Sequence, residues 1–449
     1  MIRQFIFDHQ SDDVAQLALQ RNRYPMLSDS DFRFCLQQID GRQRTRDKLP
    51  TFAQIDGWLY PPRLNLEQCS SERAARFKAS LLLTLNSQTR SSNTQFKRAA
   101  INLIDATGGY GVDTFFMSEV AAQTHYFEQN TDLAAIADHN FRLAGKSIHC
   151  HPEPFTVQSL STSLYSTPNP LIPNPLTVIY IDPARRDNHG GKVFRLEDCT
   201  PNVIEIIRLI RLIREQQNSS ISEPQIRVLL KLSPMLDFHQ AVAQLGGSWD
   251  VYVVSVNNEV KELLLLSDVS TALPIERNQI SEITCQISKI HAVMLTDNGD
   301  NFFSFTPDEE SNAEVQYLPM ADSQKPMVGM YVYEPDAALL KAGAFRLISA
   351  RYNLTKAAPN THQYFRDQKS DVRNQMLDIS GRWWQIFGVY TRVKDVQRAL
   401  KRANVLTRNY TLPADALRKQ LRLKDGGDDY IIGCRIADKP LLLHCRRLQ

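Results

Sequence analysis

The feature that most constrains the fold is a glycine cluster between two short apolar runs, within residues 101–128. The first run ends in Asp105, and three glycines follow between positions 108 and 111. The next ten residues carry apolar side chains at helical spacing, and the second apolar run ends in Glu128. This order of strand, glycine-rich turn, helix and strand predicts the first βαβ unit of a nucleotide-binding α/β sheet.

The spacing of the glycines narrows the class of ligand. Glycines let the backbone approach a ligand closely, and a helix start offers unpaired N–H groups. A dinucleotide would require G-x-G-x-x-G, whereas this turn reads G-G-x-G after an acid, which disfavours an NAD-type oxidoreductase. An acid suits an amino-bearing ligand better than a pyrophosphate, and Glu128 at the second strand end can grip ribose hydroxyls. A turn that merely joins strand to helix is the alternative.

The pattern D-x-T-G-G-x-G with a later strand-end acid resembles the cofactor site of class I S-adenosylmethionine (SAM) methyltransferases. The resemblance implies SAM as the cofactor, with Asp105 near its amino-acid moiety and Glu128 on its ribose. The cofactor-binding positions that it implies are Asp105, Thr107, Gly108, Gly109, Gly111, Asp113, Glu128 and Gln129.

The chain of 449 residues is long enough for several domains. Apolar runs alternate with helical segments over residues 99–268, which predicts an α/β fold with a doubly wound, Rossmann-like sheet. Residues 1–98 are expected to form a helical domain. Residues 271–378 are expected to form a small β-rich, ferredoxin-like module with a helical connector, and residues 379–449 a small basic α+β domain.

Composition excludes several classes of protein. Hydrophobic residues make up 43% of the chain, and no apolar run is long enough to cross a membrane. The first residues, MIRQFIFDHQ, lack the apolar core of a secretion signal. Seven scattered cysteines include no C-x-x-C pair, which argues against a disulfide framework or a zinc site. A cytoplasmic protein is expected.

Positive charge is concentrated at the C-terminal end of the sequence. The net charge is +3, yet the segment from Arg392 onward holds fourteen Lys or Arg residues against six Asp. Such asymmetry indicates that this end contacts nucleic acid. The candidate RNA-binding residues here are Lys394, Arg398, Lys401, Arg402, Arg408, Arg418 and Lys419.

A second acid, Asp182, opens the run D-P-A-R at the end of the fourth predicted strand. Methyltransferases that act on amino groups carry D/N-P-P followed by an aromatic residue there, and Asp and Pro oxygens orient the amine. In this chain Ala184 replaces the second proline and Arg185 replaces the aromatic, so the likeness is partial. The candidate catalytic residues are Asp182, Pro183 and Arg185, with Arg186 and Lys192 as contacts to the nucleic-acid backbone. Solvated arginines after a proline-terminated strand are the alternative.

Two further residues carry side chains that could take part in chemistry. Cys199 is a candidate nucleophile, because C5-pyrimidine methyltransferases use a cysteine, but theirs follows the fifth strand, which here ends in Ser233-Pro234. A structural Cys199 is favoured. His151, at the end of the third strand, has no partner at metal-ligand spacing, and the adenine contact at this strand is left open.

The whole chain resembles a bacterial family of SAM-dependent methyltransferases that end in a THUMP-like domain. The resemblance rests on EQCSSERAARFKA (67–79), DATGGYGVDTFF (105–116), YIDPARRD (180–187), VFRLEDCTPNV (193–203), YEPDAALLKAGAF (333–345) and ANVLTRNYTLPADALRKQLRLKDGG (403–427). Together with the Asp182-Pro183 strand end and the basic C-terminal segment, it leads us to expect an RNA methyltransferase that acts on tRNA or rRNA, at a base nitrogen such as a guanine amino group. An RNA-binding or assembly protein with a vestigial SAM site is the alternative.

Overall fold

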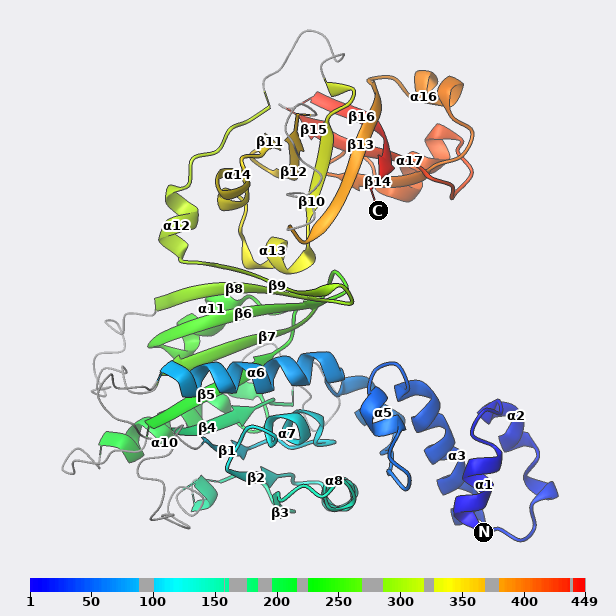
Figure 1. Ribbon diagram of the computed structural model, residues 1–449, viewed down its shortest axis with the longest axis vertical. Helices are drawn as coiled ribbons and strands as arrows, with labels where there is room; N and C mark the ends of the chain where they lie inside the picture. Colours follow the sequence, from blue (N-terminus) through cyan, green and yellow to red (C-terminus); the bar gives the residue numbers. More distant parts are fainter. Residues whose placement is uncertain are drawn as a thin grey trace. The chain divides into compact units, whose positions relative to one another are not determined.

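The computed structural model describes residues 1–88, 101–156, 158–160, 176–184, 196–215, 225–268, 286–318, 327–367, 379–436 and 439–448. The chain forms two compact units. The first comprises Met1–Trp249 and Leu263–Gln286, and the second comprises Asp250–Glu262 and Ile287–Gln449. The division between them passes through a hairpin of the larger sheet (Figure 1).

The larger sheet has the strand order β3-β2-β1-β4-β5-β7-β6-β8-β9. Strands β1 to β5 run parallel, and β7 pairs with β5 in the antiparallel direction. An antiparallel β7 between β5 and β6 separates this sheet from the all-parallel dinucleotide-binding order. The elements from β1 to β7 are β1 (Ile101–Asp105), α7 (Val112–Met117), β2 (Gln123–Phe127), α8 (Thr131–Leu143), β3 (His149–His151), β4 (Leu176–Ile181), α10 (Val203–Glu215), β5 (Gln225–Leu232), α11 (Phe238–Leu245), β6 (Ser248–Val256) and β7 (Glu259–Asp268). The predicted doubly wound sheet is confirmed.

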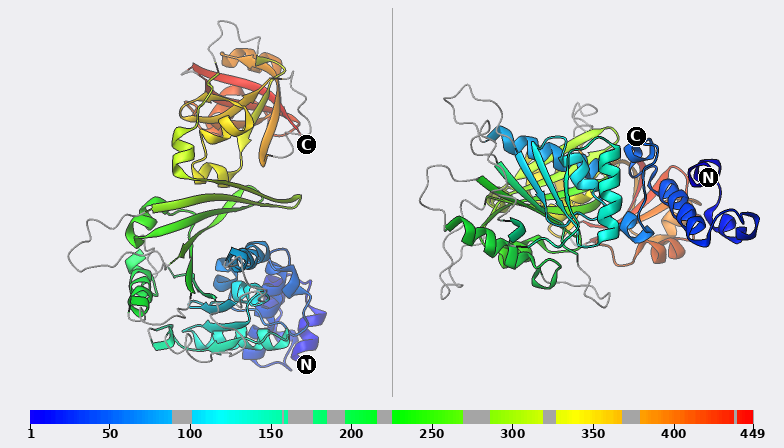
Figure 2. Two further views of the ribbon diagram at one scale, coloured as in Figure 1. Left: turned by 60° about the vertical axis from the view of Figure 1, so that its left-hand side comes forward. Right: turned by 90° about the horizontal axis from the view of Figure 1, so that it is seen from below.

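Helices precede the sheet, and they belong to the first unit. They are α1 (Ile2–Asp8), α2 (Val14–Leu19), α3 (Asp29–Thr45), α4 (Pro50–Ala53), α5 (Arg63–Gln68) and α6 (Glu72–Gln88). Phe52 and Trp58 pack in one apolar core with Phe115 and Phe116 of α7. Figure 2 shows these blue helices beside the cyan β1–α8 segment. This packing ties the region before residue 98 to the glycine turn.

The second unit holds a sheet with the strand order β11-β12-β10-β13-β16-β15-β14. The elements that follow β7 in the chain are β8 (Gln286–Thr296), β9 (Gly299–Phe305), α12 (Pro307–Asn312), β10 (Tyr331–Pro335), α13 (Ala337–Ala342), α14 (Leu347–Tyr352), β11 (Thr355–Ala358), β12 (Thr361–Arg366), β13 (Gly381–Tyr390), α16 (Val393–Ala399), β14 (Asn404–Arg408), α17 (Ala414–Leu421), β15 (Asp429–Ile436) and β16 (Lys439–Arg447). Of these, β8 and β9 belong to the larger sheet. β10 pairs with both β12 and β13. Strands on either side of the expected boundary at residue 378 therefore share one sheet.

Helices α16 and α17 cover part of this sheet. Val396, Leu417 and Leu421 are buried in a core with Ile431 of β15. Helix α16 ends at Ala399, because Leu400 adopts an extended conformation. The basic residues that follow it therefore lie in a loop before β14.

Candidate functional site

The glycine turn connects β1 to α7 and contains glycines with two different tasks. Gly109 and Gly111 have φ angles of 58° and 79°, which glycine adopts without strain. A Cβ atom on Gly108 would lie 2.1 Å from the Tyr126 ring, and one on Gly111 would lie 2.5 Å from the Phe141 ring. At Gly109 the nearest atom would be 3.7 Å away. Gly108 and Gly111 thus permit close internal packing, and Gly109 is the open position of the turn.

Asp105 ends β1 beneath this turn and is buried. Its carboxylate accepts the N–H of Thr107 at 3.0 Å and the hydroxyl of Thr114. Burial raises the pKa of Asp105 to about 7, because the two hydrogen bonds oppose the effect only in part while Asp113 and Asp182 add to it. The site therefore holds a carboxyl group that changes charge near neutral pH.

Glu128 follows β2 and joins the glycine turn to the start of α8. Its carboxylate accepts the N–H of Gly109 at 2.8 Å and the N–H of Asn130 at 2.7 Å. The Tyr126 hydroxyl donates to the Gly109 carbonyl at 2.5 Å. Glu128 is partly exposed and Gln129 is exposed. The carboxylate keeps acceptor capacity on both oxygens for a ligand at this edge.

Asp182 follows β4 and touches the glycine turn. Its backbone N–H donates to the Thr107 hydroxyl oxygen at 2.6 Å. Its side chain is 39% exposed and accepts a hydrogen bond from Lys231 of β5, with Nζ 2.6 Å from Oδ2. Ala184, two residues after Asp182, forms two backbone hydrogen bonds with Thr200. Pro183 is buried. The hydrogen bond to Thr107 places Asp182 beside the turn, and its catalytic role stays a prediction.

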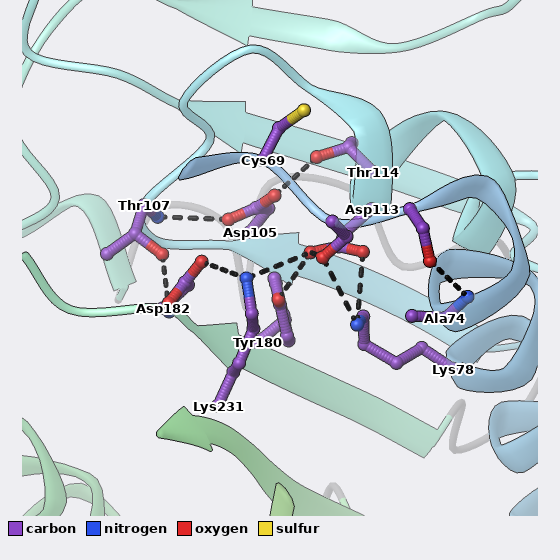
Figure 3. A network of polar contacts seen from close by, with 12 residues as sticks. Cys69, Ala74, Lys78, Asp105, Thr107, Asp113, Thr114, Tyr180, Asp182 and Lys231 are labelled. Atoms are coloured by element: carbon purple, nitrogen blue, oxygen red, sulfur yellow. Dashed lines mark hydrogen bonds and ion pairs between the residues drawn. The ribbon is translucent and has the colours of Figure 1, made fainter. Parts of the chain in front are cut away.

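Asp113, in the first turn of α7, lies in a buried polar cluster (Figure 3). Ser70 and Tyr180 donate to its Oδ2 at 2.8 and 2.6 Å, and the Lys78 ammonium lies 3.2 Å from its Oδ1. Burial alone would raise the pKa of Asp113, but Lys78, Lys231 and these hydrogen bonds outweigh it and hold the pKa below its usual value. Its contacts are internal, so its role as a cofactor ligand stays a prediction that its burial disfavours.

Two lysines of this cluster were missed by reading the sequence. Lys231 lies 2.6 Å from Asp182 and 3.9 Å from Asp113, and Figure 3 shows it between the two carboxylates. Lys78 comes from α6, and its side chain is 0% exposed. The signal for Lys231 is a single lysine near the end of the apolar strand R-V-L-L-K-L. Lys78 occurs in a stretch that carries the family resemblance but shows no separate signal of chemistry.

A cavity of about 190 Å³ lies near the same sheet edge, after β3 and before α10. Phe155, Leu160, Pro201 and Ile206 form its apolar wall, and Asn202 contributes a polar group. The cavity adjoins the chain that pairs with Ala184, since Pro201 follows Thr200.

The remaining candidates for chemistry near the sheet have internal positions or no ligand set. Cys199 is buried, which agrees with a structural role. His151 stacks on Phe127, with ring centroids 4.3 Å apart, and its Nε2 lies 3.1 Å from the Nδ1 of His125. Within the described residues, no group of three or more His, Cys, Asp or Glu side chains is arranged to hold a metal ion. Arg185, Arg186 and Lys192 lie outside the described residues.

The basic candidates of the second unit comprise two partly buried, paired residues and five exposed ones, of which Arg398 also lies 3.9 Å from Asp395. Arg408 forms an ion pair with buried Glu334, its Nε 2.6 Å from Oε1. Arg418 lies 3.0 Å from both Asp415 and Asp425. The exposed candidates are Lys394, Arg398, Lys401, Arg402 and Lys419.

These exposed residues are joined by backbone contacts near the end of α16. The N–H of Lys424 donates to the carbonyl of Lys401 at 3.1 Å, and Arg402 forms a bridge with Lys424. Gln397 of α16 donates to the Gln420 carbonyl beside Lys419 at 3.0 Å. The loop after α16 and the end of α17 thus form a basic surface made of Lys401, Arg402, Lys419 and Lys424. In the part of the chain that the structure describes, no helix is both long and apolar enough to span a bilayer.

Comparison with known proteins identifies the two C-terminal regions. Residues 331–372 match a family of ferredoxin-like domains. Residues 381–447 match a THUMP domain-like family, which confirms the predicted THUMP-like end of the chain.

The methyltransferase resemblance is also confirmed. Two proteins from Mycobacterium tuberculosis, strains CDC 1551 and H37Rv, are described as uncharacterised SAM-dependent methyltransferases. Each is 24% identical over 262 residues, which is 58% of this chain and 60% of the relative. A crystal structure of a candidate methyltransferase from Porphyromonas gingivalis W83 aligns with a TM-score of 0.75 and 27% identity over 100% of this chain and 98% of that one. The matched region thus spans less than two thirds of each mycobacterial relative.

Proposed function

We propose that this protein is a SAM-dependent methyltransferase that modifies a base nitrogen of RNA. The observation that carries the proposal is the hydrogen bond between the Asp182 N–H and the Thr107 hydroxyl at 2.6 Å. The strand tip that would present the methyl acceptor adjoins the turn that would hold the methyl donor. The description of the mycobacterial relatives as SAM-dependent supports the same cofactor.

The residues of the turn fit SAM. Gly109 leaves space for close approach, and Glu128 retains lone pairs for two ribose hydroxyls. Asp105 supplies negative charge beneath the turn, where the ammonium of the methionine moiety would lie. Phe155 and Pro201 give the nearby cavity apolar walls against which a nucleobase can pack.

Catalysis would depend on positioning. SAM supplies an electrophilic methyl group on a sulfonium. Asp182 and the Pro183 carbonyl would accept hydrogen bonds from the acceptor N–H groups and aim the nitrogen lone pair at that methyl. As the nitrogen gains the methyl, it releases a proton, which the partly exposed Asp182 can pass to water.

RNA is the acceptor that the second unit favours. Its basic surface offers lysine and arginine side chains for phosphate contacts, and its THUMP-like region suits a nucleic-acid partner. A guanine amino group is the proposed target, in tRNA or rRNA. The free cysteines among the described residues fit a reducing compartment, so we place the protein in the cytoplasm.

The test uses the full-length protein and RNA from a strain that lacks it. Calorimetry should detect SAM binding, and transfer of a labelled methyl group to this RNA should follow. Asp182→Ala should lower transfer at least about 100-fold while SAM binding survives. Mass spectrometry of nucleosides from the deletion strain should reveal one missing methylated base. Transfer that persists in Asp182→Ala would remove Asp182 from the proposed role.

A second candidate is an RNA-binding or assembly protein with a vestigial cofactor site. The internal contacts of Asp113 and Lys231 favour this second candidate, because the two side chains occupy part of the polar space beside the turn. Calorimetry separates the two, since a vestigial site gives no heat with SAM while RNA still binds. Binding of NADH instead would point to an oxidoreductase.

A further inference from the structure

We propose that Lys231 is a positioning residue that restricts the methyl acceptor to a neutral amine and excludes an ammonium. The inference rests on the proposed function, because it assigns the acceptor to Asp182. The observation behind this inference does not involve the glycine turn. The Lys231 ammonium is paired with one oxygen of the Asp182 carboxylate, with Nζ 2.6 Å from Oδ2.

Lys231 is held in place from its other side. Its Nζ lies 3.9 Å from Oδ2 of Asp113, and Asp113 is fixed in turn by Lys78, Ser70 and Tyr180. The Lys231 side chain is 12% exposed, which leaves little surface for a phosphate.

This arrangement changes what Asp182 can recognise. A free carboxylate would attract a cationic amine, such as a lysine side chain or an N-terminus, more strongly than a neutral one. With Lys231 on Oδ2, the pair is neutral overall, and the second oxygen remains to accept one N–H group. Because Lys231 neutralises Asp182, a cation at the acceptor position gains no net attraction to offset the loss of its hydration, whereas the amino group of a nucleobase is neutral and pays no such cost.

Sinefungin probes this position without the RNA. It is a SAM analogue in which a carbon bearing an amino group replaces the sulfonium and its methyl, so an ammonium points to where the acceptor would lie. S-adenosylhomocysteine lacks that group and serves as the reference ligand. The ratio of the two affinities therefore reports the charge beside Asp182.

Calorimetry with both ligands tests the proposal on the full chain. In Lys231→Met, sinefungin should gain at least about tenfold in affinity relative to S-adenosylhomocysteine, because the unpaired Asp182 then attracts the ammonium. Lys231→Arg keeps the charge and should preserve the ratio. Lys146→Met, which removes another lysine paired within the first unit, should also preserve it.

The outcomes distinguish this inference from the proposed function. If Lys231→Met binds both ligands with the wild-type ratio, Lys231 does not select against a cation and the inference is wrong. If the wild type binds neither ligand, the proposed function itself fails. Lys231→Gln removes the charge while keeping a polar side chain, and it replaces the methionine variant if thermal unfolding shows that variant to be misfolded.

Discussion

Lys78 Nζ lies 3.2 Å from Asp113 Oδ1, although Lys78 belongs to α6 and Asp113 to α7 of the sheet region. The lysine side chain is fully buried and Asp113 is nearly so. The positive charge of Lys78, which belongs to the N-terminal helices, is thus compensated by a carboxylate of the region that holds the candidate cofactor turn. The helices before residue 98 are therefore needed for the stability of that region.

Lys78→Met should destabilise the first unit by about 3–5 kcal/mol, because it removes the ammonium that lies nearest to the buried Asp113 carboxylate and compensates its charge. Urea unfolding followed by fluorescence measures the loss. Arg76→Met is the matched control on the same helix, since Arg76 is half exposed in its ion pair with Glu72, and it should cost no more than about 1 kcal/mol. Equal losses of unfolding free energy in the two variants would mean that Lys78 does not compensate a buried charge.

SAM binding should depend on pH through Asp105. The pKa of Asp105 is raised to about 7, so the carboxylate that favours an ammonium forms only as pH rises through that value. The affinity for SAM should therefore increase from about pH 5.5 to about pH 8.5, as measured by calorimetry. A flat profile in the wild type would rule out this role for Asp105.

Asp105→Asn should separate stability from binding. A pKa above the unfolded value means that the folded state holds its proton more tightly, so the contribution of Asp105 to stability falls as pH rises from about 4 to about 7. At pH 8 the asparagine variant should unfold at a higher temperature than the wild type and bind SAM about tenfold more weakly. The gain in stability should disappear near pH 4, and a variant less stable than the wild type at pH 8 would contradict the prediction.

Gly108→Ala should destabilise the fold by more than about 3 kcal/mol, because the added Cβ would lie 2.1 Å from the Tyr126 ring. Gly145→Ala is the control. Gly145 has a φ of 67° but nothing within 4 Å of the added atom, so only backbone strain of about 1–2 kcal/mol is expected. Chemical denaturation of both variants measures the difference in unfolding free energy. A Gly108→Ala variant as stable as Gly145→Ala would refute the prediction.

Replacing Lys401 and Arg402 together by alanine should weaken the binding of RNAs of any sequence. The slope of log affinity against log salt concentration should fall by the equivalent of about two phosphate contacts. Filter binding at several salt concentrations gives the slope. The paired substitution Arg3→Ala and Arg33→Ala removes two exposed charges from the first unit and should leave the slope unchanged. Loss of affinity with an unaltered slope would mean that these residues do not contact phosphates.

The parts of the site that were predictable lie at the ends of strands or in the turn between them. Asp105, Gly109 and Glu128 follow from one pattern of strand, turn and helix, and the topology of a parallel sheet brings Asp182 to the same edge. Lys231 and Lys78 were not predictable in this way. Their partners are distant in the chain, and a lysine in an apolar run reads equally well as a surface residue until its carboxylate is located.

Sequence patterns also left the tasks of individual residues open. Gly108 and Gly111 match a ligand-binding turn, but the structure shows that the Tyr126 and Phe141 rings occupy the space beside them. Arg408 matches a basic RNA-binding segment, whereas its guanidinium pairs with Glu334. A residue type records what chemistry is possible, and its neighbours in space decide which part of that chemistry is used.

Strand β10 lies in the ferredoxin-like region and β13 in the THUMP-like region, and they pair over Tyr331–Pro335. A fragment limited to residues 381–447 would therefore expose one edge of β13, with unpaired backbone groups open to other chains. Such a fragment is expected to aggregate or to pair with copies of itself. Grafting the THUMP-like region onto another enzyme would succeed only if residues 331–372 travel with it.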